Sequence, residues 1–134
     1  MARSNVELVR SIYDAWERGD YSSAAWADPS IEFVFLDGPS PGRWIGHAGM
    51  AAANWDWLSA WRNVRQTVDE VRELDGERVL VLHQYSASGR VSGLQTEQIR
   101  TGAAAFFEIR RGKVVKLAHW FDRDRALTDL GLAQ

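Results

Sequence analysis

Apolar residues recur along this chain with two periods, about 3.6 residues and 2 residues, which are typical of helices and strands. The helical period predicts helices at four places, namely residues 4–18, 21–26, 46–61 and 123–130. The strand period predicts strands at five places, namely residues 31–36, 64–74, 79–85, 95–109 and 114–121. Hairpin-length connections join the later strands, so an α+β fold is favoured over the alternating order of a parallel sheet.

Capping and turn residues set several of these boundaries. Ser4 followed by Glu7 matches a capping box, in which each side chain satisfies the other residue's backbone amide at a helix start. Gly102 could introduce an irregularity into its long strand, and residues 86–93 have the composition of a loop. In the second long helix, Trp55 lies off the predicted buried stripe.

Composition and charge narrow the classes of protein. The 134 residues suit one domain spanning 1–134, since two independent cores would need a longer chain. The 16 basic and 18 acidic residues are mixed along the chain, which argues against nucleic-acid binding and a polybasic membrane anchor. No apolar stretch reaches the roughly 20 residues of a membrane span, and no signal-peptide pattern is seen, so we expect a cytoplasmic protein. The lack of cysteine excludes disulfides, thiolate metal sites and a cysteine nucleophile.

Several short motifs together resemble a known family. They read YDAWERGD, GERV, RGKVV, FDRDRAL and LGL, at residues 13–20, 76–79, 111–115, 121–127 and 130–132. Over nearly its whole length the chain resembles the SnoaL-like polyketide cyclase group of the nuclear transport factor 2-like superfamily. The resemblance implies a cone-shaped α+β fold, in which a strongly curved, mostly antiparallel sheet wraps around a long helix and encloses a pocket. Because members include cyclases, isomerases, epoxide hydrolases, dehydratases and binding proteins, the resemblance identifies the fold better than the reaction.

The resemblance also bears on one reaction of the superfamily, that of ketosteroid isomerase. The catalytic tyrosine of the isomerase falls at Ile12, and a one-residue shift would bring Tyr13 to that position. The two catalytic aspartates of the isomerase fall at Phe33 and Ala105. None of these residues is kept, which argues against isomerase chemistry of that kind. The catalytic residues of the epoxide hydrolases find no secure match either.

Alternate side chains of the strands would line the implied pocket, because successive strand residues point to opposite faces. In the last strand the resemblance implies an inner row of Leu117, His119 and Phe121, on which His119 is the one titratable group. We consider His119 as a catalytic acid or base, with a structural, hydrogen-bonded histidine as the alternative. In the strand over 79–85 we expect Gln84 to point inward and bind a ligand carbonyl or hydroxyl group, with a loop-orienting hydrogen bond as the alternative.

Other candidates have equally plain structural alternatives. Aromatic side chains could form the pocket walls or simply core, namely Tyr13, Trp16, Phe33, Phe35, Trp57, Trp61 and Phe121. Asp122 is a second catalytic candidate because it lies in a family motif, but its position before the last predicted helix favours an N-cap. The three histidines lie on different predicted elements without clustered carboxylates, so we expect no metal site.

Two functions follow from this interpretation. The first is binding of a small hydrophobic carbonyl or polycyclic molecule in the cone pocket. The alternative is a cyclase, isomerase, or hydratase or hydrolase that needs no cofactor and uses acid–base catalysis by His119. We also expect a homodimer through the outer face of the sheet, where an apolar patch is predicted from Val81, His83, Tyr85, Phe106 and Trp120.

Overall fold

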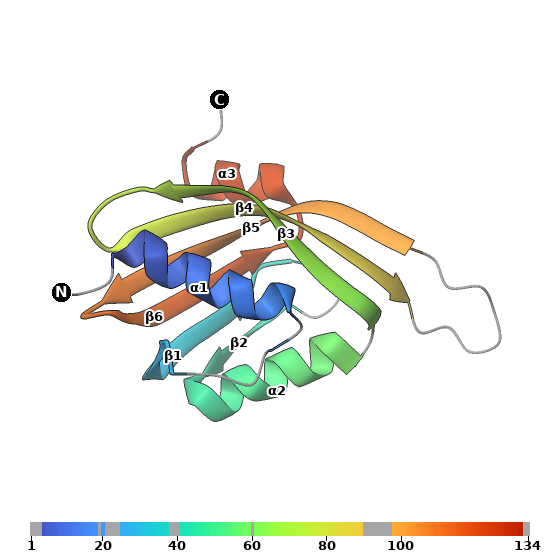
Figure 1. Ribbon diagram of the computed structural model, residues 1–134, viewed down its shortest axis with the longest axis horizontal. Coiled ribbons are helices and arrows are strands. Elements are labelled where there is room, and N and C mark those ends of the chain that lie inside the picture. Colours follow the sequence, from blue (N-terminus) through green and yellow to red (C-terminus); the bar gives the residue numbers. More distant parts are fainter. Residues whose placement is uncertain are drawn as a thin grey trace.

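In chain order, the elements of the described chain (Figure 1) are α1 (Asn5–Glu17), β1 (Ala27–Phe35), β2 (Gly42–Ile45), α2 (Gly46–Ser59), β3 (Trp61–Glu73), β4 (Arg78–Gly89), β5 (Gln98–Arg110), β6 (Lys113–Trp120) and α3 (Arg123–Asp129). The computed structural model describes residues 4–18, 20, 25–37, 41–59, 61–89 and 98–132, without the side chains of residues 56–59, 61–65, 85–89 and 98–101. No helix within these ranges is long and apolar enough to cross a membrane.

The strands form one mixed sheet in the order β2-β1-β6-β5-β4-β3. β1 pairs in parallel with β6, and every other pair of neighbouring strands is antiparallel. The sheet curls around α1, α2 lies beside β1, and α3 packs on the opposite face of the sheet (Figure 1). This arrangement confirms the expected α+β fold with a curved, mostly antiparallel sheet around a long helix.

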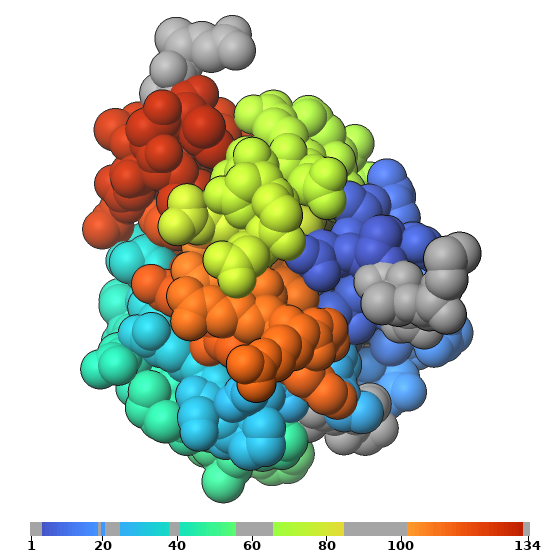
Figure 2. All heavy atoms as spheres, turned by 90° about the vertical axis from the view of Figure 1, so that its left-hand side faces the viewer, coloured from blue at the N-terminus to red at the C-terminus, as the bar shows by residue number. Residues whose placement is uncertain are grey.

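The start of α1 is fixed by the capping box that the sequence predicts. The Ser4 hydroxyl accepts a hydrogen bond from the Glu7 amide at 3.1 Å, and the Ser4 amide donates to the Glu7 carboxylate at 3.3 Å. The Asn5 side-chain amide donates to the Gly76 carbonyl at 2.8 Å and ties this end of the helix to the β3–β4 turn. Figure 2 shows the two segments side by side on one face of the molecule, beside the β5–β6 turn.

Several element boundaries differ from the prediction. β1 already begins at Ala27, immediately after the segment 21–26, and most of the predicted helical turns in that segment lie outside the described residues. The edge strand β2 was not predicted, and α2 ends before Trp61, which begins β3 instead. β4 continues through part of the predicted loop to Gly89, and Gly102 pairs with its β4 partner without a shift in register. Strand pairing creates these differences, and pairing depends on residues distant in sequence.

The sheet has a hydrophobic core on each face. The inner core lies between α1 and the concave face and includes Val79 and Val81, whereas the outer core lies beneath α3 and includes Leu80 and Leu82. Our prediction that Gln84 and its row point into the cone is therefore wrong, and the alternate row faces α1. Both rows of β4 are apolar because both faces of the sheet are covered, so alternation by itself does not say which row points inward.

The predicted apolar patch on the outer face is divided between the two sides of the sheet. Val81 and His83 point into the inner core, where neither is exposed. Trp120 and Phe106 do lie on the outer face, but Trp120 is 4% exposed and both belong to the core that includes α3. The homodimer therefore stays a prediction, with a smaller apolar surface than the sequence suggested.

Candidate functional site

The inner row of β6 brings His119 into a group of aromatic rings. Its imidazole lies 5.2 Å from the ring of Phe33 and 5.3 Å from that of Phe35, measured between ring centroids, and is stacked on Phe35. The Trp16 ring of α1 lies 6.4 Å from the imidazole, and the Phe121 ring stacks on Phe35 at 5.8 Å. The predicted pocket residues of α1, β1 and the end of β6 thus meet around one histidine.

His119 is buried in this surrounding, with 4% of its surface exposed. Its Nδ1 atom is fully buried and has no hydrogen-bond partner among the described residues. Burial lowers the pKa of His119 to about 3, because the imidazolium form would lose its hydration. The ring is therefore neutral at pH 7, with one nitrogen that donates and one that accepts.

A second buried histidine, which the sequence analysis assigned to the wrong face, lies on the inner side of β4. The ring of His83 contacts Tyr13 of α1 at 5.4 Å, and burial is the main cause that lowers the pKa of His83 to about 3. Electrostatic repulsion from His119, in its protonated form, and from the Arg123 guanidinium adds to this lowering of the His83 pKa. Gln66 of β3, which is 5% exposed, is a further buried polar side chain that the sequence analysis missed.

Small side chains separate the two histidines. In the register of the sheet, His83 pairs with Ala103 and His119 pairs with Ala105, both on the intervening strand β5. β4 and β6 are two strand spacings apart, about 10 Å, and the two histidines are also offset by two residues along β5. The small side chains of Ala103 and Ala105 therefore lie between the two imidazoles. The sequence did contain a signal for the inner position of His83. Its row on β4 also carries the apolar residues Val79 and Val81, and a row of this kind can equally face inward.

Gln84 takes part in a polar cluster on the outer face instead of a pocket. Its amide donates to the Asp69 carboxylate at 3.1 and 3.3 Å, and the same carboxylate accepts from the Arg123 guanidinium at 2.7 Å. The hydrogen bonds from Arg123 and Gln84 lower the pKa of Asp69. Arg123 also donates to the His83 carbonyl at 2.9 Å and to the Ala103 carbonyl at 3.3 Å. The cluster thus ties α3 to the strand segments that carry the inner polar residues.

The remaining candidates take structural positions. Asp122 is the N-cap of α3, and its carboxylate accepts from the amides of Asp124 and Arg125. Asp37, which the sequence analysis did not single out, accepts from the Phe121 amide at 2.5 Å and so holds the end of β6. The side chains of Trp57 and Trp61 lie outside the described residues.

Among the described residues, apolar side chains occupy the inner-face positions that match the two catalytic aspartates of the isomerase. Ile12, Phe33 and Ala105 are buried in the inner core, with 2%, 1% and 0% of their surfaces exposed. Phe33 and Ala105 stand where the resemblance implied the two aspartates. Ile12 stands at one of the two positions considered for the tyrosine, and Tyr13, at the other, is also buried in the inner core. The surroundings of His119 therefore suit an apolar molecule better than a reaction that develops charge.

Comparisons with known proteins agree with this geometry. The sequence model of the SnoaL-like domain family matches residues 9–117, while no curated protein matches the chain. A nuclear transport factor 2-like protein of unknown function from Burkholderia pseudomallei is 23% identical, with a TM-score of 0.78, and the match covers 94% of this chain and 97% of that one.

Two further similar structures contain small molecules. A protein with a ketosteroid isomerase-like fold from Catenulispora acidiphila, in complex with trimethylamine, is 13% identical with a TM-score of 0.72, covering 97% of this chain and 95% of that chain. TerC, co-crystallised with polyporic acid, is 20% identical with a TM-score of 0.74, covering 96% of each chain. At these identities the likeness shows the fold alone, but the family match extends over most of the sequence. The chain belongs to the SnoaL-like domain family, with a nuclear transport factor 2-like fold.

Proposed function

We propose that this protein binds a small hydrophobic molecule that carries a carbonyl or hydroxyl group, on the inner face of the sheet beside His119. The observation that carries the proposal is the Nδ1 atom of His119, which is buried without a hydrogen-bond partner among the described residues. A buried polar atom left unpaired costs about 1–3 kcal/mol, which a hydrogen bond to a ligand would offset. The two similar structures that hold small molecules add support at the level of the fold.

The surroundings of His119 favour a flat, apolar ligand with a single polar group. The rings of Phe33 and Phe35 contact the imidazole and each other, so they give the surroundings of His119 an aromatic wall. Ala105, paired with His119 on the neighbouring strand, presents only a methyl group there. A neutral imidazole can accept from a hydroxyl group or donate to a carbonyl oxygen, so both ligand classes suit this site.

Binding is favoured over turnover by the protonation state of His119. A general acid or base works best when its pKa lies near the working pH, whereas burial lowers the pKa of His119 to about 3. Acid–base catalysis would require the bound substrate to raise this pKa by several units. The apolar residues Ile12, Phe33 and Ala105 bring no charge to the inner face that would help.

The test uses a matched pair of probes, 1-indanone and indane, which differ in the carbonyl group. Protein with ¹⁵N-labelled histidine is titrated with each, and the imidazole nitrogens report directly on His119. We expect 1-indanone to shift the His119 signals and to bind about fivefold more weakly to His119→Phe, while indane binds both proteins alike. The exposed His47 provides the control, because His47→Gln should leave both affinities unchanged. Absence of binding, or an equal loss for both probes, contradicts the proposal.

A further inference from the structure

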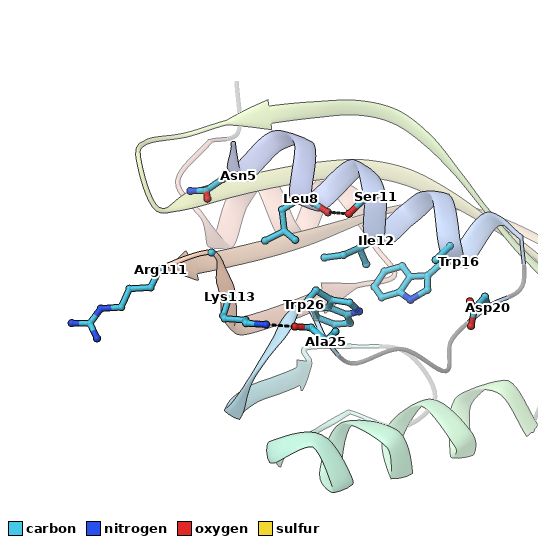
Figure 3. Close-up of a pocket in the computed structure, with 12 residues that line it drawn as sticks. Asn5, Leu8, Ser11, Ile12, Trp16, Asp20, Ala25, Trp26, Arg111 and Lys113 are labelled. Carbon is cyan, nitrogen blue, oxygen red and sulfur yellow. Dashed lines mark hydrogen bonds between the residues drawn. The ribbon is translucent and has the colours of Figure 1, made fainter. Parts of the chain in front are cut away.

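A hollow runs along α1 at the edge of the inner core (Figure 3). It lies between the helix, the turn at 25–26 and the β5–β6 turn, and has a volume of about 850 Å³. Leu8 and Ile12 line it from the helix, and Trp26 lines it from the opposite wall. Trp16 separates this groove from the candidate site, since the same indole lines the groove and contacts the ring of His119.

Hydrogen bonds hold the groove walls in position. The Trp26 carbonyl accepts from the Val114 amide at 2.9 Å, which fixes the 25–26 turn to the start of β6. α1 forms the opposite wall. The hydrogen bond from the Asn5 side chain to the Gly76 carbonyl holds the start of this helix in place. The indoles of Trp16 and Trp26 meet edge to face at 6.0 Å. The volume lies within the range of roughly 300–1,000 Å³ that is usual for small-molecule pockets.

One cationic side chain extends along the apolar lining. The Lys113 side chain runs along the wall opposite α1, and its ammonium group donates to the Ala25 carbonyl (Figure 3), which occupies one of its three N–H donors. Lys113 forms no ion pair within the part of the chain that the structure describes, whereas the nearby Arg110 is paired with both Glu77 and Glu108. The Lys113 ammonium group therefore has two further N–H donors for another partner.

The other charged groups of the lining lie toward the ends of the groove. Asp20 is at the end near Trp16, and the guanidinium of Arg111 points away from the hollow (Figure 3). The Ser11 hydroxyl donates back to the Leu8 carbonyl at 2.7 Å within the helix. An apolar ligand in the middle of the groove would therefore meet Lys113 as its nearest charge.

We propose that this groove is a separate binding site for an aromatic carboxylate. The ring system lies between Ile12 and Trp26, and the carboxylate accepts hydrogen bonds from Lys113. The apolar walls provide the affinity for the ring, and the ammonium group selects the anion over a neutral molecule of the same shape. This site is distinct from the one proposed beside His119, which offers an uncharged polar partner.

The test compares sodium 2-naphthoate with neutral 2-naphthamide by ¹H–¹⁵N NMR titration of the full chain. We expect naphthoate to shift the amide signals of Leu8, Ile12, Trp26 and Lys113, and to bind about three- to fivefold more tightly than the amide, as suits one partly solvated ion pair. Lys113→Met keeps a similar side-chain length and should remove this difference. Lys116→Met, three residues along the same strand, is the matched control and should retain it.

A second variant tests the location of the site without removing a charge. Ala15 is a half-buried residue of the groove wall, so Ala15→Phe should fill the hollow and abolish binding of both probes. Ala52→Phe adds the same ring to an exposed position of α2 and should leave both affinities unchanged. Equal weakening of both probes by Lys113→Met would overturn the selection of anions. Shifts confined to the amides of His119 and its neighbours would overturn the groove as the site and leave the proposed function intact.

Discussion

Acidification between pH 7.5 and pH 5.0 should destabilise the fold through its two buried histidines. Burial lowers the pKa of both His83 and His119 to about 3, from an ordinary value of 6.5. Below pH 6.5 the unfolded chain binds a proton at each residue, while the folded chain keeps both rings neutral. The unfolded state then binds more protons than the folded state, so the free energy of unfolding falls as the pH is lowered toward 3.

The size of the effect follows from this difference in proton binding. Between pH 7.5 and pH 5.0, each histidine should lower the free energy of unfolding by about 2 kcal/mol, and the pair by about 4 kcal/mol. The loss is set almost entirely by the pKa in the unfolded chain, provided that the folded value stays below about 4. A loss of about 4 kcal/mol is a large part of the total stability of a typical domain.

The assay is urea unfolding followed by circular dichroism at both pH values. His119→Leu removes one titrating group from an apolar surrounding, so its loss on acidification should be about 2 kcal/mol, half that of the natural protein. His119→Gln is a second variant of similar size that also does not titrate. His47→Gln is the matched control, because it replaces an exposed histidine of α2 and leaves both buried histidines in place.

One result would refute the reasoning directly. If the natural protein and His119→Leu lose the same free energy of unfolding between the two pH values, His119 is not held neutral by burial. The explanation of its pKa, and with it the preference for binding over acid–base catalysis, would then be wrong.

Three further predictions concern stability and are checked by the same urea assay at pH 7.5. Asp122→Ala should lower the free energy of unfolding by about 1 kcal/mol through loss of the α3 cap, while Asp122→Asn, which can still cap, should lower it much less; equal losses would contradict a capping role. Trp16→Ala should lower the free energy of unfolding by about 3–5 kcal/mol, because this residue is only 6% exposed. Trp55→Ala should lower it by less than about 0.5 kcal/mol, because Trp55 is 73% exposed. Arg123→Met should lower the free energy of unfolding by about 1–3 kcal/mol, since it leaves the His83 and Ala103 carbonyls without their guanidinium donor. Asp69→Asn should lower it less, because this change removes only the partly solvated ion pair.

Local interactions account for what the sequence determined by itself. The capping box of Ser4 and Glu7 and the cap at Asp122 involve residues two or three positions apart, so the sequence contains both partners of each interaction. The inner position of His119 was obtained from the family motifs together with strand alternation. The α+β class and the curled sheet followed from the order of the elements and the resemblance.

The tertiary structure decided which face each strand presents and which polar groups meet. Gln84 lies outside and His83 inside because α1 and α3 cover opposite faces of β4, and both of its rows are apolar for that reason. Gln66, His83 and His119 lie on three different strands, and the groove beside Lys113 needs α1 to lie against the turn at 25–26. These arrangements depend on contacts between residues far apart in the chain, and local periodicity contains no information about such contacts.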